Sequence, residues 1–152
     1  MRATDLIAQD HRTVRDMFVE LEALSSGDGQ ARQDLLDRIV DELEVHALME
    51  EEIFYPAVRE ASRRIDDAEA GHQHLRSVIG EVQGREPDSP EFIRGVRLIK
   101  QVVLAHVMEE EAGIFLDAER MGLDVLEDLG ARMESRKQEL KTSLLQRGKR
   151  AA

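Results

Sequence analysis

The sequence predicts an all-α fold, an antiparallel up-down-up-down four-helix bundle with a short fifth helix at the C-terminus. Charged residues make up 35% of the 152 residues and aromatic residues only 3%, a composition typical of long helices exposed to water. Apolar residues recur every three or four positions over long segments, which is the period of an α-helix. Turn-forming residues interrupt this pattern around Gly27, Pro87 and Gly122. Because the loops are short, consecutive helices are expected to lie antiparallel.

The first two helices are predicted at about residues 4–24 and 30–62. The apolar stripe of the first includes one histidine and consists of Ile7, His11, Val14, Phe18 and Leu21. The stripe of the second includes a histidine and a glutamate and consists of Leu36, Ile39, Leu43, His46, Glu50, Ile53 and Ala57. Pro56 cannot donate a backbone hydrogen bond and clashes with the preceding turn, so we expect a bend or a helix end near Phe54 and Tyr55.

The third and fourth helices repeat this pattern. The polar residues 62–64 separate the third helix from the second, and its stripe is Ile65, Ala68, His72, Leu75, Ile79 and Val82. Ser89 and Pro90 are a favourable helix start, a capping residue followed by proline in the first turn. The fourth helix should end near Gly122, and its stripe is Phe92, Val96, Ile99, Val103, His106, Glu110 and Ile114.

Two segments follow from this order of helices: a four-helix bundle at residues 1–122 and a C-terminal segment at residues 123–152. Asp124 and Glu127 have the spacing of a capping box that opens a short helix. The segment ends in a basic tail that contains Arg147, Lys149 and Arg150. We expect it to pack on the bundle or to extend from it.

Charge and cysteine content exclude several classes of function. With 21 Lys and Arg against 32 Asp and Glu, the formal net charge is −11, so the surface should repel nucleic acids and anionic membranes. The chain has no cysteine, which excludes disulfides, thiolate nucleophiles and iron–sulfur clusters; a metal would need nitrogen and oxygen ligands. No apolar run reaches the roughly 18 residues of a membrane span, and no apolar leader follows Met1. We therefore expect a cytoplasmic protein.

The two halves of the bundle form an internal repeat. At an offset of about 60 residues, His11 aligns with His72, and the His-x-x-x-Glu pair that begins at His46 aligns with the pair that begins at His106. Residues four apart lie on one helix face, so each imidazole and its carboxylate point the same way, into the apolar stripe. A carboxylate in an apolar core costs several kcal/mol or becomes neutral, and metal cations would remove that conflict.

Nitrogen and carboxylate ligands without thiolates suit iron or manganese, and six groups are too many for one catalytic zinc. Two adjacent ions fit better, with a glutamate able to bridge them and two imidazoles for each ion. Two metal-free alternatives remain: His-Glu pairs on a helix surface, worth a few tenths of a kcal/mol, and a helical interaction protein.

The ordered set of motifs resembles the hemerythrin-like family, the HHE cation-binding domains, over about residues 4–120. The motifs that carry the resemblance are Asp10-His11, His46-x-x-x-Glu50-Glu51 with Phe54-Tyr55-Pro56, Gly71-His72, and His106-x-x-x-Glu110-Glu111 with Ile114-Phe115. The resemblance implies a non-haem di-iron centre, oxo- or hydroxo-bridged when oxidised. The metal ligands that it implies are His11, His46, Glu50, His72, His106 and Glu110, with Glu50 and Glu110 as bridges.

Two residues bear on the reaction that the resemblance implies. Arg76 stands where the oxygen-carrying hemerythrins have a fifth histidine, one turn after His72, which argues against reversible oxygen carriage. His74 cannot replace that ligand, because two residues along a helix are a rotation of about 200°. Tyr55 is a candidate additional ligand, since a phenolate would favour ferric iron and peroxide chemistry.

The predicted function is therefore a di-iron protein that binds or reacts with hydrogen peroxide, oxygen or nitric oxide, with catalase-like removal of peroxide favoured. The alternative is an oxygen- or iron-sensing module without turnover. The expected partner is a small diatomic molecule or peroxide rather than nucleic acid or membrane. The sequence does not identify an electron donor or a protein partner.

Overall fold

The computed structural model describes the backbone of residues 1–25 and 27–151 and the side chains up to residue 148 in those ranges. Lys149 and Arg150 of the predicted basic tail have side chains outside the described part of the chain. Every regular element in the described ranges is helical, which confirms the predicted fold class. The elements are α1 (Ala3–Glu22), α2 (Gly29–Met49), η1 (Glu50–Phe54), α3 (Tyr55–Val58), α4 (Ile65–Gln83), α5 (Pro90–Glu109), η2 (Glu110–Ile114), α6 (Phe115–Glu119) and α7 (Leu123–Ala151).

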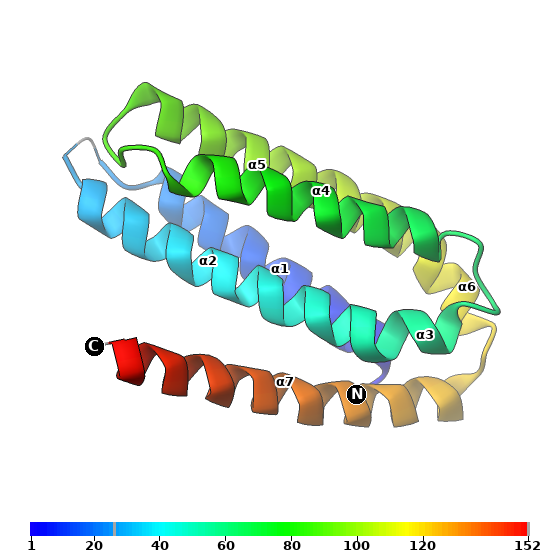
Figure 1. Ribbon diagram of the computed structural model, residues 1–152. Coiled ribbons are helices and arrows are strands. Elements are labelled where there is room, and N and C mark those ends of the chain that lie inside the picture. Colours follow the sequence, from blue (N-terminus) through cyan, green and yellow to red (C-terminus); the bar gives the residue numbers. More distant parts are fainter. Residues whose placement is uncertain (26, 152) are drawn as a thin grey trace.

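Four rods form the bundle, and Figure 1 shows the α1/α2 pair lying beneath the α4/α5 pair. The second rod is continuous through α2, η1 and α3, and the fourth through α5, η2 and α6. Ser89 caps the fourth rod as predicted, because its hydroxyl accepts a hydrogen bond from the backbone N–H of Phe92. The apolar core is divided into two clusters, one containing Val14 and Leu43 and the other containing Ile7 and Met49. Polar residues of the same stripes lie between them.

The irregularity predicted at Pro56 takes the form of a π-helical turn, η1, which ends two residues before the proline. The chain remains helical through Pro56 to Val58, short of the predicted end at residue 62. A second π turn, η2, lies at the equivalent place in the other half, where Leu116 occupies the position of the proline. Because both halves have the turn, the proline alone does not account for it. A wider turn of i to i+5 hydrogen bonds brings the fifth residue after each glutamate towards the glutamate's face of the helix.

The C-terminal helix was predicted to be short, and this was wrong: α7 has 29 residues. It is long because its apolar residues keep the helical period and bury against the bundle at Leu126, Leu129, Met133 and Leu140. Its main contacts are with α1, α2 and η1, so it lies along one side of the bundle (Figure 1). Gly130 permits close packing, since a Cβ atom there would collide with the carbonyl oxygen of Met1.

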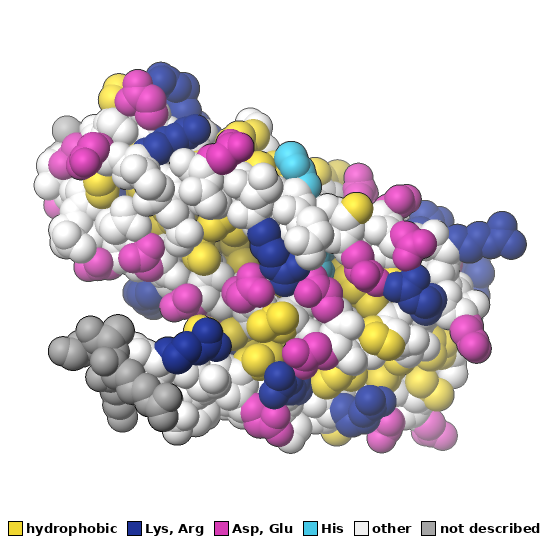
Figure 2. All heavy atoms as spheres, viewed as in Figure 1, with side chains coloured by type: hydrophobic (Ala, Val, Ile, Leu, Met, Phe, Trp, Pro, Cys, Tyr) yellow, Lys and Arg dark blue, Asp and Glu magenta, His cyan; other side chains and the backbone are white. Residues whose placement is uncertain are grey.

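Charged side chains of both signs are interspersed on the face formed by α2, α4 and α7 (Figure 2). Ion pairs fasten α7 to this face: Arg136 to Glu52 at 2.6 Å and Lys141 to Glu42 at 3.5 Å. No described helix combines the length and the hydropathy that crossing a lipid bilayer requires.

Candidate metal centre

The fold brings all six predicted ligand residues together between the two apolar clusters. They form two groups in which the nearest donor atoms lie within 4.8 Å of one another: His11, His46 and Glu110 in the first, and Glu50, His72 and His106 in the second. Five of the six residues are buried, and His106 is partly exposed. Each group draws on more than one rod, so neither could form in an isolated helix.

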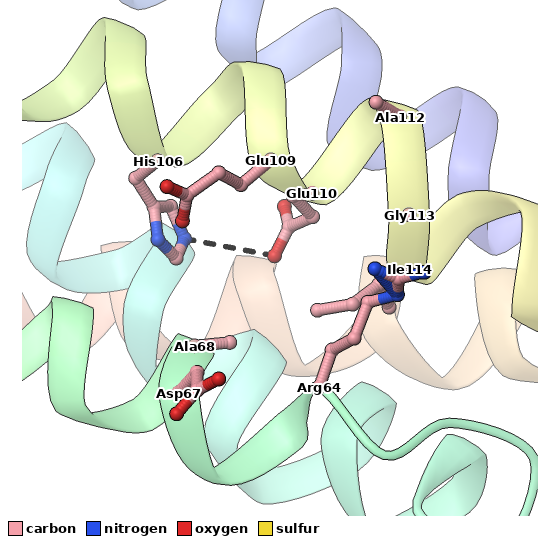
Figure 3. A pocket seen from close by; sticks show the side chains of 9 residues that line it. All are labelled: Arg64, Asp67, Ala68, His106, Glu109, Glu110, Ala112, Gly113 and Ile114. Carbon is pink, nitrogen blue, oxygen red and sulfur yellow. Dashed lines mark ion pairs between the residues drawn. The ribbon is translucent and has the colours of Figure 1, made fainter.

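Each glutamate lies between an imidazole of one group and an imidazole of the other. Glu50 Oε1 is 3.0 Å from His46 Nε2 and 3.2 Å from His72 Nε2. Glu110 also contacts both groups, but through different oxygens: Oε1 is 3.2 Å from His11 Nε2, and Oε2 is 3.6 Å from His106 Nε2. Figure 3 shows the last of these contacts as a dashed line. Each carboxylate therefore lies between the two groups and contacts both.

Most of the donor atoms that face the centre have no hydrogen bond of good geometry and contact one another only as ion pairs; His72 Nε2 and Glu110 Oε2, which contact Tyr55, are the exceptions. In the described part of the chain, seven buried side-chain nitrogen and oxygen atoms have no hydrogen-bond partner, and six of them belong to this cluster. The six are His11 Nε2, His46 Nε2, His106 Nε2, both oxygens of Glu50 and Oε1 of Glu110. An unsatisfied buried polar atom costs about 1–3 kcal/mol, so six in one place are not explained by packing. A pair of cations would satisfy all six, and the residues present fit such a pair.

The charges in the cluster are strongly coupled. Burial lowers the pKa of His46, but the carboxylates of Glu50 and Asp10 outweigh burial and raise that pKa well above its ordinary value. Burial raises the pKa of Glu110, but contact with His106 and His11 outweighs it and leaves the pKa well below its ordinary value. Imidazolium and carboxylate thus stabilise each other, and cations would take over the role of the imidazolium protons.

In three of the four histidines a carboxylate contacts Nδ1, the ring nitrogen that points away from the centre. Nδ1 lies 3.0 Å from Glu111 Oε1 in His11, 3.0 Å from Asp10 Oδ2 in His46 and 2.7 Å from Glu51 Oε2 in His72. Such contacts orient the ring and direct Nε2 towards a metal.

Two of these carboxylates also have a cationic partner. Lys137 of α7 donates to Asp10 Oδ1 at 2.5 Å. Arg76 donates to both oxygens of Glu51 and to Glu44, which raises the pKa of Arg76 and leaves it unsuited to bind a metal. Sequence reasoning missed the role of Lys137, which lies 127 residues from Asp10 and follows no motif. His74 is exposed, as its position on the helix predicted.

Tyr55 is fully buried and reaches the cluster from the end of the first π turn. Its hydroxyl donates a 2.5 Å hydrogen bond to Glu110 Oε2 and lies 3.4 Å from His72 Nε2. Its ring stacks on His72 with 5.4 Å between centroids, and Phe115, at the end of the other π turn, stacks on His11 at 6.3 Å. Burial and the two glutamates raise the pKa of the Tyr55 phenol, so without a cation it stays protonated. The π turns thus place one aromatic ring against each of the two histidines, His11 and His72, that have no glutamate four residues later.

Comparison with known proteins matches most of the chain to a cation-binding domain. The model of the hemerythrin HHE cation-binding domain matches residues 2–116. A DNA nickase of Nostoc sp. is 32% identical over 117 residues, which are 76% of this chain but only 33% of that protein, so the chain spans a third of that relative's length. An uncharacterized protein of Mycobacterium tuberculosis is 24% identical, covering 95% of this chain and 91% of its own.

A solved structure has the same fold. The crystal structure of a hemerythrin HHE cation-binding domain-containing protein from Mycobacterium kansasii superposes with a TM-score of 0.86 at 22% identity. The match covers 95% of this chain and 90% of that chain, and a match of this extent includes most of α7. The five long rods are therefore shared.

Proposed function

This chain belongs to the hemerythrin HHE cation-binding family, and on that basis we propose that it holds two iron ions through His11, His46, Glu50, His72, His106 and Glu110. The six unsatisfied donor atoms at the centre of the bundle carry this proposal. Imidazoles outnumber carboxylates by four to two, which favours iron over manganese, since manganese prefers oxygen ligands. Glu50 and Glu110 are the proposed bridges, because each faces both groups.

We propose that the centre reacts with a small oxidant and that removal of hydrogen peroxide is its favoured activity. Bound iron would supply redox chemistry between its ferrous and ferric states. Arg76 stands one turn after His72, where a fifth histidine would lie, and it binds Glu44 and Glu51 instead of facing the centre. The group of Glu50, His72 and His106 therefore lacks a fifth histidine. Without a metal ion the Tyr55 hydroxyl donates its proton to a hydrogen bond with Glu110 Oε2, and buried apolar residues lie on both sides of the cluster.

A sensing or binding module without turnover is the second candidate. Lys137 of α7 binds Asp10, which in turn contacts His46. Through these contacts, metal binding at the centre could change the position of α7. The name of the Nostoc relative describes an activity on DNA, but two thirds of that protein have no counterpart here. A net charge of −11 repels phosphate, and we propose no nucleic-acid partner.

Metal analysis and turnover together test the proposed function. Protein purified without chelators should contain close to two iron ions per chain and should release oxygen from hydrogen peroxide. Two iron ions without oxygen release would favour the sensing module. Protein that cannot be loaded with iron would contradict both candidates.

The role of Tyr55 has a spectroscopic test. We propose that its oxygen is an additional ligand, because it already lies among the donor atoms of Glu110 and His72. The oxidised protein should then show a phenolate-to-iron absorption band that is absent from Tyr55→Phe, while both proteins contain two iron ions. If the wild-type protein lacks the band, Tyr55 serves only as a hydrogen-bond donor to Glu110.

A further inference from the structure

The two sides of the centre that are related by the internal repeat are not equally covered. The first half contributes α1, α2 and η1, and these are the elements against which α7 packs. Their equivalents in the second half are α4, α5 and η2. At that side lies a cavity of about 350 Å³, lined by residues of α4, α5 and η2 (Figure 3). The cavity thus occupies the place in the second half that α7 covers in the first.

The side chains at equivalent positions of the two halves are smaller on the side of the cavity. Leu6 and Ile7, buried in the first half, correspond to Asp67 and Ala68, which line the cavity. Ile53, which packs in the apolar cluster that includes α7, corresponds to Gly113 on the cavity wall. Smaller side chains and a missing helix leave room beside the centre.

The cavity reaches two of the proposed ligands, His106 and Glu110. The side chain of His106 is 14% exposed, against 3–9% for the other three histidines. At the position that corresponds to Asp10, which holds His46, stands Gly71. A Cβ atom at Gly71 would lie 3.1 Å from His106 Nδ1, so the glycine lets the His106 ring approach this helix closely and provides no carboxylate for its Nδ1.

We propose that a small uncharged oxidant enters through this cavity and binds beside the ion held by Glu50, His72 and His106, while α7 closes the equivalent route on the other side. The proposal rests on the di-iron centre proposed above. An anionic ligand is disfavoured because, besides the proposed ligand Glu110, the carboxylates of Asp67 and Glu109 line the cavity against one arginine, Arg64. A molecule the size of peroxide or nitric oxide needs only a small part of the volume.

Arg64 lines the cavity with a largely exposed side chain. A Cβ atom at Gly113 would lie 2.8 Å from Arg64 Cδ and Nε, so the glycine allows the arginine side chain to lie across the wall formed by η2 (Figure 3). Arg64 is held there by Asp117 at 3.4 Å, and its side chain remains 60% exposed. Removal of this side chain should widen the opening without disturbing the core.

Stopped-flow binding of nitric oxide to the reduced, iron-loaded protein tests the route. Ala68→Leu places three more carbon atoms in the cavity and should slow the association several-fold, whereas Arg64→Ala should accelerate it. The matched control is Ala105→Leu, the same change at an exposed position of α5 outside the cavity lining, and its rate should equal that of the wild type. Iron content and the resting spectrum, recorded first, should be unchanged in all three variants.

Each alternative result has a distinct meaning. Equal rates in Ala68→Leu, Arg64→Ala and wild type, at two iron ions per chain, would overturn the cavity route and leave the proposed function intact. Faster association in Lys137→Ala alone would place the entrance under α7. Failure of the wild type to bind iron would contradict the proposed function itself. If Ala68→Leu does not fold, Arg64→Ala decides, because it changes an exposed side chain.

The charge preference is tested with azide as an anionic probe of the oxidised protein. Glu109→Gln removes one carboxylate from the cavity wall and should accelerate azide binding several-fold. The same variant should bind nitric oxide at the wild-type rate. An azide rate that Glu109→Gln does not change would show that the ligand does not pass this wall.

Discussion

Replacement of Glu110 by alanine is expected to reduce the iron content from two ions per chain to almost none, whereas replacement of His106 by alanine should leave one ion. Glu110 faces an imidazole of each group, so its loss removes a ligand from both proposed ions. His106 belongs to one group only, and the first group of His11, His46 and Glu110 stays complete without it. The His106→Ala variant should also have a lower thermal stability. It loses the ion held by Glu50, His72 and His106, so a buried carboxylate loses its counter-charge.

Iron per chain, measured by elemental analysis after reconstitution, checks this prediction. His74→Ala is the matched control, since His74 lies two residues from His72 but is exposed, and it should retain two ions. Glu50→Ala should behave like Glu110→Ala, because Glu50 also faces both groups. Two ions in Glu110→Ala would contradict the proposed bridging role, and two ions in His106→Ala would contradict the ligand assignment.

Removal of iron by a chelator is expected to lower the melting temperature of the wild-type protein by about 10 °C. A ligand present at 1,000 times its dissociation constant stabilises the native state by about 4 kcal/mol. In a domain of about 150 residues, each kcal/mol shifts the melting temperature by about 2–4 °C. The effect should be large here because the six donor atoms are buried without hydrogen bonds when no cation is bound.

Thermal unfolding, followed by circular dichroism with and without the chelator, gives the measurement. The chelator should leave the melting temperature of Glu110→Ala unchanged, because that variant has no iron to lose, and this controls for effects of the chelator on the fold. An equal melting temperature of iron-loaded and iron-free wild type would mean that the centre contributes nothing to stability.

The convergence of the six proposed ligand residues could be predicted because its signal is local. His46 and Glu50 are four residues apart, and a helix of known period places them on one face whatever surrounds it. The repeat of that pair at His106 and Glu110, in stripes that are otherwise apolar, indicated that both pairs point into the core. The order of the motifs then identified the family, which the matched domain model confirms.

The π turns were beyond local prediction. Pro56 signalled an irregularity, but the turn lies before it and also occurs in the other half, where no proline follows. The turns place Tyr55 against His72 and Phe115 against His11. In an unbroken α-helix each aromatic residue, five positions after its glutamate, would point about 140° away from that glutamate and could not make these contacts.

The amino-acid sequence by itself determined the class of the fold, the four rods and the six side chains that converge between them, because helical periodicity and the burial of apolar stripes act over a few residues. Only the tertiary structure decided which groups support and expose the centre: Lys137 behind Asp10, Arg76 on Glu51, and the cavity beside His106. These contacts join residues tens of positions apart, and their distances depend on how whole helices pack. For the same reason the length of α7, and the side of the bundle that it closes, became evident only in the folded molecule.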